Sequence, residues 1–179
     1  MSLAHAILGM LTQQPMTGYD LKTTCFDQSI AHFWQADQAQ IYRTLDKLAE
    51  QGFVTSHLEV QEDRPNRKVY SITDSGHAEL LRWMQTEQAL PTYREPFLIQ
   101  LFFGQLLDNA QIISIMQQQL EAHQARLEHY RAITLPELDA PYITRDLLFQ
   151  RMTLEMGIRI EHAYMDWLKD CIARVQSLG

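Results

Sequence analysis

The amino-acid sequence predicts a mainly α-helical, α+β fold in two domains, residues 1–90 and 91–179. Residues 3–52 contain three stretches with the apolar spacing of a helix, whereas residues 53–73 alternate apolar and polar side chains as strands do. After the prolines of residues 91–96 the spacing is helical again. The order helix, helix, helix, hairpin, helix is typical of a winged helix-turn-helix domain, and the C-terminal half is predicted to be an antiparallel helical domain.

The first two predicted helices span residues 3–12 and 18–29. Apolar side chains at helical spacing give the first helix one buried face, formed by Ala4, Ile7, Leu8 and Leu11. The segment around Pro15 ends this helix, because proline does not continue one. Thr17 then offers a hydroxyl that can cap the N-terminus of the second helix.

The third predicted helix begins after Asp37, whose carboxylate is a good N-cap. It ends at Gly52, which suits the left-handed conformation that is common after a helix. Residues 53–61 and 67–73 then form the strands of a hairpin with a charged turn between them. A fourth helix opens after Thr73 and carries four large apolar residues, Leu80, Leu81, Trp83 and Met84.

The C-terminal half is predicted to contain a short apolar helix at residues 97–107 and longer helices at 109–133 and 143–175. The first long helix carries a seam of near-heptad spacing, formed by Ile113, Met116, Leu120, His123, Leu127 and Tyr130. The second approaches about 50 Å in length, and its apolar stripe exceeds what the rest of one chain can cover. We therefore expect a homodimer with a contact formed by Leu120, Leu127, Leu154, Ile158, Met165, Leu168 and Ile172.

The net charge of −7 opposes binding to a polyanion, because nucleic-acid-binding domains usually carry excess positive charge. Binding to DNA therefore requires the few cations to converge on one face. No apolar run reaches the ~18 residues of a membrane span, and the N-terminus lacks the pattern of a signal peptide. Cys25 and Cys171 lie far apart in segments predicted to be helical. We expect a reduced, cytoplasmic protein with two free thiols.

The third helix and the turn of the hairpin hold the candidate contacts to DNA. With Ile41, Leu45 and Leu48 buried, the opposite face of the helix presents side chains that can reach base edges and phosphates. The turn concentrates cations that can contact the phosphates along a minor groove. A solvated helix face and a plain surface loop are the alternatives. The candidate DNA-binding residues are Gln38, Gln40, Tyr42, Arg43 and Lys47 in the helix and Arg64, Asn66, Arg67 and Lys68 in the wing.

These segments resemble the PadR family of bacterial transcription regulators. The similar segments are Thr17–Leu21, at the start of the second helix, Phe33–Trp34 and Gln38–Tyr42, around the recognition helix, and Arg67–Thr73 with Gly76, in the wing and the helix after it. Phe33–Ala36 and Arg94–Phe97 are similar to the long-tailed, AphA-like virulence-activator branch. Arg43 stands where much of the family has proline. The resemblance implies a homodimer, joined by an antiparallel helical tail, that binds a palindromic operator in double-stranded DNA.

The sequence carries no pattern of an enzyme: it has no glycine-rich phosphate loop, no Gly-x-Ser-x-Gly, no His-Glu-x-x-His and no Cys-x-x-Cys. We expect no catalytic activity, no cofactor and no metal ion. The favoured interpretation is a sequence-specific transcription regulator that acts as a homodimer on an inverted-repeat operator. Two alternatives stay open, namely a repressor that responds to an aromatic effector bound near the dimer interface and a protein-interaction module that has lost DNA binding.

Overall fold

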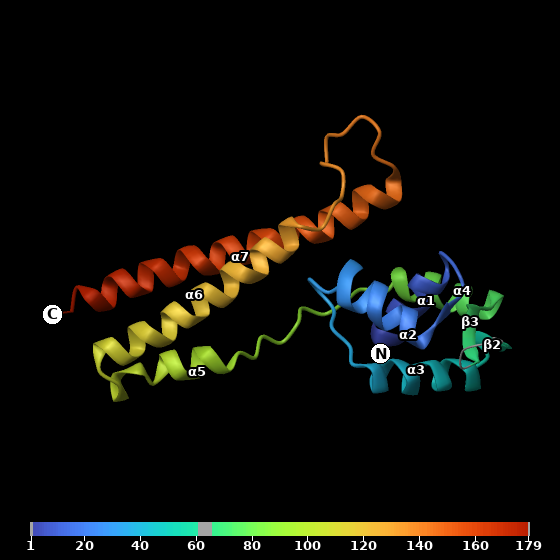
Figure 1. The fold of residues 1–179 in the computed structure, drawn as a ribbon, viewed down its shortest axis with the longest axis horizontal. Helices are drawn as coiled ribbons and strands as arrows, with labels where there is room; N and C mark the ends of the chain where they lie inside the picture. The colour runs from blue at the N-terminus through green and yellow to red at the C-terminus, as the bar shows by residue number, and fades with distance from the viewer. Residues whose placement is uncertain (1, 61–65, 179) are drawn as a thin grey trace. The chain divides into compact units, whose positions relative to one another are not determined.

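The computed structural model of the chain describes residues 2–60 and 66–178. The chain divides into two compact units, residues 1–90 and 91–179 (Figure 1). Most of the described chain is helical, and one small antiparallel sheet belongs to the first unit. The predicted mainly helical α+β fold is confirmed.

Three helices of the N-terminal unit lie where the sequence predicts them: α1 (Ser2–Leu11), α3 (Gln38–Glu50) and α4 (Asp74–Met84). They surround one apolar core, whose members include Ile7, Leu8, Leu11, Phe26, Ile41, Leu45, Leu48, Tyr70 and Leu80. Full burial of one such side chain contributes about 1.5–3 kcal/mol. This core therefore holds α3 in a defined orientation.

The second predicted helix is present but changes type along its length. After α2 (Gly18–Asp20) the chain continues as a π-helix, η1 (Leu21–Ser29). Thr17 caps α2 as predicted, since its hydroxyl oxygen accepts from the N–H of Asp20 at 3.0 Å. Within η1 the hydroxyl of Thr24 donates to the carbonyl of Asp20, and that of Ser29 donates to the carbonyl of Thr24. Side chains that bond to backbone carbonyls loosen α-helical pairing, which accounts for the wider helix.

The sheet holds three antiparallel strands, β1 (Met16–Thr17), β2 (Val54–Glu59) and β3 (Arg67–Ile72), in the order β1-β3-β2. The predicted hairpin is β2–β3, in which Val54 pairs with Ile72 and Glu59 with Arg67. The sequence does not predict β1, because two residues are too few to show an alternating pattern. The pairing of Thr17 with Val69 places the start of α2 beside the hairpin.

A polar contact joins α1 to α4. His5 is buried and stacks on Trp83, with the ring centroids 4.5 Å apart. Its Nε2 lies 3.1 Å from Oε1 of Glu79, whose carboxylate also accepts two hydrogen bonds from Arg82. The hydrogen bonds from Arg82 and His5 lower the pKa of Glu79 to about 2. The carboxylate therefore stays charged and ties the two helices together.

The C-terminal unit consists of α5 (Pro96–Phe102), a 3-10 turn η2 (Gly104–Leu106), α6 (Asn109–Arg131) and α7 (Arg145–Gln176). The two long helices run antiparallel along each other, and α5 lies beside the first part of α6 (Figure 1). Their common core contains Phe97, Ile112, Met116 and Leu168. The predicted seam of α6 is confirmed at Met116, His123, Leu127 and Tyr130, but it begins at Ile112 because that side chain is buried and Ile113 only partly so.

A polar network, which is buried at His123 and Glu161, links the helices of this unit. Nδ1 of His123 lies 2.5 Å from Oε2 of Glu161, and the imidazole stacks on Tyr164 at 4.0 Å between centroids. The hydroxyl of Tyr164 donates to Glu95, which also accepts from the hydroxyl of Tyr93 at 2.5 Å. That hydrogen bond, with burial, raises the pKa of Tyr93 to about 12. The network connects the start of α5 with α7, and it pairs α6 with α7 through a buried histidine and glutamate.

We predict that Glu79→Gln lowers the thermal stability of the protein at pH 7 by a few degrees. A carboxylate whose pKa is lowered on folding stabilises the native state above its unfolded pKa of 4.5, and this contribution is lost as the pH falls toward 2. The melting temperatures of variant and wild type, followed by circular dichroism, should therefore approach each other as the pH falls below 4.5 and meet near pH 2. Glu87→Gln, at an exposed position, is the control. A difference of the same size at pH 7 and pH 3 would show that the charge of Glu79 is not the cause.

Candidate nucleic-acid interface

The buried stripe of α3 determines which side chains this helix exposes. Ile41 and Leu45 have no exposed surface, and Leu48 is 2% exposed. The other side of the helix carries all five candidate residues, which are exposed: Gln38, Gln40, Tyr42, Arg43 and Lys47. Helical spacing places Gln40, Arg43 and Lys47 together, opposite the core, and places Gln38 and Tyr42 on one flank. The predicted helix contacts thus form a central group and a flanking group.

The first turn of α3 is held by a capping box. Asp37 accepts from the N–H of Gln40 at 2.7 Å, and the side-chain oxygen of Gln40 accepts from the N–H of Asp37 at 3.1 Å. The amide oxygen of Gln40 is therefore used inside the protein, whereas its amide NH₂ group points toward solvent as a donor. Any base contact of Gln40 is expected to be made through that donor.

A shallow hollow of about 410 Å³ lies along the exposed side of α3. Gln40, Arg43 and Lys47 line one wall together with Thr44, and the remaining lining residues are Leu3, Trp34 and Gln35. Trp34 and Gln35 were not among the predicted contacts. The Phe33–Ala36 segment, which carries part of the family resemblance, is the sequence feature that points to them. The hollow places an aromatic ring and an amide next to the predicted contact residues.

Tyr42 is positioned by a glycine of α2. A methyl group added at Gly18 would lie 2.6 Å from Cε1 of the Tyr42 ring, closer than side chains approach one another. The absence of a side chain at Gly18 therefore allows the ring to rest on the start of α2. This contact joins the first helix of the helix-turn-helix pair to the second and directs the Tyr42 side chain along the flank of α3.

The described cations of the wing reach back toward the body of the unit. Nη2 of Arg67 lies 2.7 Å from Oδ2 of Asp20, and Nζ of Lys68 lies 4.0 Å from Oδ1 of Asp46 on α3. The Lys68 ammonium also lies 5.0 Å from the centre of the Tyr70 ring. Asn66 is exposed. Of the predicted wing contacts, Arg64 lies outside the described residues, and Asn66 directly precedes β3. Arg67 and Lys68, which form the wing base, are the first two residues of β3, beside the turn.

One member of each ion pair has a shifted pKa. Burial alone would raise the pKa of Asp20, but the hydrogen bonds from Thr17 and the Arg67 guanidinium outweigh it and lower the pKa. The pKa of Lys68 is raised, mainly by Tyr70 and also by Asp46. Asp20 and Lys68 are therefore charged near neutral pH, and each lies beside a side chain of the opposite charge type.

Most residues predicted for the dimer contact lie in the seam between α6 and α7 of one chain. Leu154 and Leu168 have no exposed surface, and Leu127 is 3% exposed. The other four are partly buried: Leu120, Ile158, Met165 and Ile172. Side chains that one chain already buries can gain little from a partner.

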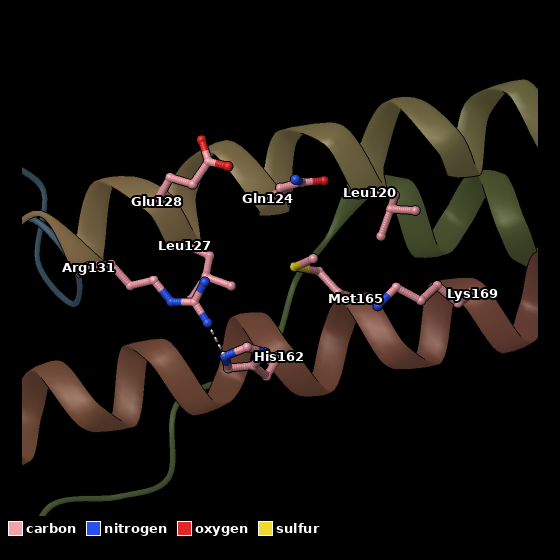
Figure 2. A pocket seen from close by; sticks show the side chains of 8 residues that line it. All are labelled: Leu120, Gln124, Leu127, Glu128, Arg131, His162, Met165 and Lys169. Atoms are coloured by element: carbon pink, nitrogen blue, oxygen red, sulfur yellow. Dashed lines mark hydrogen bonds between the residues drawn. The ribbon is translucent and has the colours of Figure 1, made fainter.

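A groove of about 310 Å³ runs along this seam (Figure 2). Leu120 and Leu127 of α6 face Met165 of α7 across it, as Figure 2 shows. Polar side chains line its edges: Gln124, Glu128 and Arg131 of α6, and His162 and Lys169 of α7. Nη2 of Arg131 lies 3.1 Å from Nε2 of His162 at one end of the groove. The groove has an apolar floor between charged walls.

A different face of α7 leaves large apolar side chains exposed. Phe149, Met152, Met156 and Ile160 follow one another at helical spacing, and each has about half of its surface exposed. The same face continues toward the C-terminus as Tyr164, Trp167 and Cys171, which pack against the core around Phe97 of α5. The part of this face beyond the reach of α5 is therefore apolar and uncovered within the described chain.

Across residues 2–60 and 66–178, no helix combines the length and the apolar character that crossing a bilayer requires. In the same part of the chain, no group of three or more histidine, cysteine, aspartate or glutamate side chains is arranged to hold a metal ion.

Each unit matches a family model. Residues 7–82 match the transcriptional regulator PadR-like family, and residues 93–176 match the virulence activator alpha C-term family. The negative transcriptional regulator PadR of Bacillus subtilis is 29% identical over 178 residues, with 97% of both chains covered. The probable transcriptional regulator Rv1176c of Mycobacterium tuberculosis is 33% identical over 188 residues, with 98% of both chains covered.

Solved structures show the same similarity along the whole chain. Bacillus subtilis PadR in complex with operator DNA superposes with a TM-score of 0.85 at 28% identity, over 98% of this chain and 99% of that chain. The same protein in complex with p-coumaric acid has a TM-score of 0.78 at 28% identity, with the same coverage. The Vibrio cholerae virulence activator AphA has a TM-score of 0.76 at 29% identity, with 99% of both chains covered. The predicted winged helix with a helical tail is thereby confirmed.

We predict that Gly18→Ala destabilises the protein by about 0.5–1.5 kcal/mol, because the new methyl group pushes the partly exposed Tyr42 ring out of its rotamer. Urea unfolding followed by circular dichroism measures this change. Gly9→Ala is the matched control, since a methyl group there has no atom within 4 Å. In a helix interior that exchange is expected to stabilise by about 0.5–1 kcal/mol. Equal stabilities of the two variants would contradict the contact between α2 and Tyr42.

Proposed function

Because this chain belongs to the PadR-like family of transcriptional regulators, we propose that it is a sequence-specific DNA-binding regulator that acts as a homodimer on an inverted-repeat operator. The observation that carries the proposal is the exposed side of α3, where Gln40, Arg43 and Lys47 share one surface opposite the buried stripe. The relative solved with operator DNA supports it. Membership of a family of transcription regulators supports a role without catalysis. A protein that binds operators is expected in the cytoplasm, where bacterial DNA lies.

In this proposal α3 enters the major groove, where some of its side chains contact bases and others contact phosphates. Arg43 and the amide NH₂ group of Gln40 contact base edges, because guanidinium and amide groups form directional hydrogen bonds with bases. Lys47 and the hydroxyl of Tyr42 contact phosphates, which fixes the orientation of the helix without reading sequence. Gln38 lies on the flank next to Tyr42. Trp34 and Gln35 extend the surface beyond α3.

The wing supplies phosphate contacts beside those of α3. Arg67 and Lys68 form the wing base, and Lys68 lies 4.0 Å from Asp46 of α3 itself. The wing base and α3 are thus close enough for one stretch of duplex to touch both. Asn66 and Arg64 complete the predicted wing contacts.

Dimerisation is proposed to use the uncovered apolar face of α7. This face carries a continuous row of apolar side chains: Phe149, Met152, Met156 and Ile160. Exposure of this apolar surface to water is unfavourable, so its burial would stabilise a dimer. Ile99, Phe102 and Leu106, of α5 and η2, add further exposed apolar surface in the same unit. A second copy related by a two-fold axis would bury both surfaces. Two α3 helices held by such a dimer can read the two halves of an inverted repeat.

A ligand-responsive regulator is the second candidate function. One observation favours it: the Bacillus subtilis relative has been solved with p-coumaric acid. In this chain the groove between α6 and α7 joins an apolar floor to the Arg131 guanidinium and has a volume at the lower end of small-molecule sites. An aromatic acid that releases the protein from its operator would identify this form of the regulator.

We predict that Arg43→Ala costs about 1–3 kcal/mol of operator affinity and relaxes the preference at one base pair. Lys47→Ala should weaken binding to all duplexes alike and reduce the slope of log K against log salt by about 0.9 per subunit. Selection of bound fragments from random DNA would supply the operator, and fluorescence anisotropy would supply the affinities.

Lys169→Ala is the matched control for both substitutions, because it removes the same charge from α7. It should bind as the wild type does. If selection yields no consensus at physiological salt and a stable partner protein is captured instead, the DNA-binding proposal is wrong and the interaction module is favoured.

We predict that Met156→Glu combined with Ile160→Glu converts the dimer to a monomer, because two carboxylates would be buried in an apolar contact. Size-exclusion chromatography with light scattering reports the mass, and circular dichroism reports whether the helices remain. Ala173→Glu, at an exposed position on another side of α7, should leave the dimer intact. A double variant that stays dimeric would exclude this face as the contact.

A further inference from the structure

The wing cations have partners before any DNA is present. Arg67 lies 2.7 Å from Asp20, and Lys68 lies 4.0 Å from Asp46. We propose that Asp46, with Asp20, competes with DNA phosphates for these cations and thereby suppresses binding to non-operator DNA. The inference rests on the proposed function and deepens it, since it assigns control of non-operator binding to residues that need not touch a base.

The geometry allows phosphates to exchange with the carboxylates. The Lys68 side chain is 49% exposed and that of Asp46 is 64% exposed, so both are accessible to solvent and to a duplex. Exposed ion pairs of this kind contribute little to stability, which means that a phosphate can replace the carboxylate. The displaced carboxylate then remains close to the DNA backbone and repels it.

The competition weakens operator and non-operator complexes from different starting affinities. Non-operator binding depends almost entirely on phosphate contacts, so the loss of a free cation and the gain of a repelling carboxylate both weaken it. Operator binding bears the same cost but adds hydrogen bonds to bases, so it starts from a higher affinity. The carboxylates therefore lower both affinities by a similar factor, and at a given protein concentration the weaker non-operator complexes are the first to dissociate.

Asp46 tests the idea better than Asp20 does. Asp20 also accepts from the N–H and the hydroxyl of Thr17, at 3.2 and 2.8 Å, so it belongs to the capping box of α2. Asp46 lies on the exposed side of α3, and its ion pair with Lys68 is what the structure shows for it. Replacing Asp46 with asparagine removes the charge and keeps the shape. A purely structural residue would lose function when replaced, whereas a competitor of DNA gives tighter binding.

The experiment measures binding of the full-length protein to a labelled random-sequence duplex by fluorescence anisotropy over a range of salt concentrations. Asp46→Asn should bind this duplex roughly threefold to tenfold more tightly at low salt, with a slope against log salt steeper by about 0.9 per subunit. Glu50→Gln is the matched control, because it removes the same charge one turn further along α3. Its affinity should change less than that of Asp46→Asn.

A double-mutant cycle shows whether Asp46 acts through Lys68. In a Lys68→Met background, Asp46→Asn should give a clearly smaller gain in affinity than in the wild type, because only the direct repulsion between Asp46 and the phosphates is then removed. Equal affinities of Asp46→Asn and Glu50→Gln, or weaker binding by Asp46→Asn, would overturn the inference while the proposed function stands. A wild-type protein that binds neither the random duplex at low salt nor any duplex recovered by selection would remove the proposed function and this inference together.

Discussion

The packing of Ile41, Leu45 and Leu48 into the N-terminal core is the contact on which the proposed DNA interface depends. These three side chains expose 2% of their surface or less, and their burial determines the rotation of α3 about its axis. With that rotation given, Gln40, Arg43 and Lys47 face outward together. The contact of Tyr42 with Gly18 then relates α3 to α2, and the pairing of Thr17 with Val69 relates α2 to the wing. Recognition helix and wing are thus parts of one rigid arrangement.

The negative net charge of the protein is the second constraint on DNA binding. The chain carries 22 acidic and 15 basic residues, so the long-range field of the whole molecule repels DNA. Binding must come from cations that lie close to phosphates, where short distance outweighs the distant negative charge, because salt screens interactions beyond about 8–10 Å. For the same reason, the carboxylates of Asp20 and Asp46 have a large effect on DNA binding in this account. Asp20 lies beside Arg67 and Asp46 lies beside Lys68, and both cations are proposed to contact DNA phosphates. A change in the charge of either carboxylate therefore changes the affinity for every duplex.

Local patterns in the sequence predict much of this structure. Apolar spacing gives the helices, and Thr17, Asp37 and Gly52 mark their ends, since capping depends on residues close in sequence. Contacts between distant residues are not visible in this way. The pair of Arg67 with Asp20 depends on how the wing folds back, and β1 is too short to leave a pattern.

The apolar stripe of α7 shows the same limit. Periodicity identifies apolar faces but does not say which of them α6 covers. Leu154 and Leu168 are buried inside the chain, whereas Met156 and Ile160 on the neighbouring face are exposed. The assignment of a dimer surface therefore needs the fold. In the same way Glu161, a charged residue inside the helical core, is explained by its contacts with His123 and Arg126 of α6, which the sequence alone does not show.

The central claim is that a few cations on two paired subunits bind DNA although the protein has a negative net charge. The salt dependence of duplex binding by the intact wild-type protein tests this claim most directly. Lys47, Arg67 and Lys68 of two subunits would contact about six phosphates, so log K should fall linearly with log salt at a slope of roughly −5. The slope should be measured at protein concentrations where light scattering shows a dimer. A slope near zero, or binding of the same strength by a monomer, would contradict this mode of DNA binding.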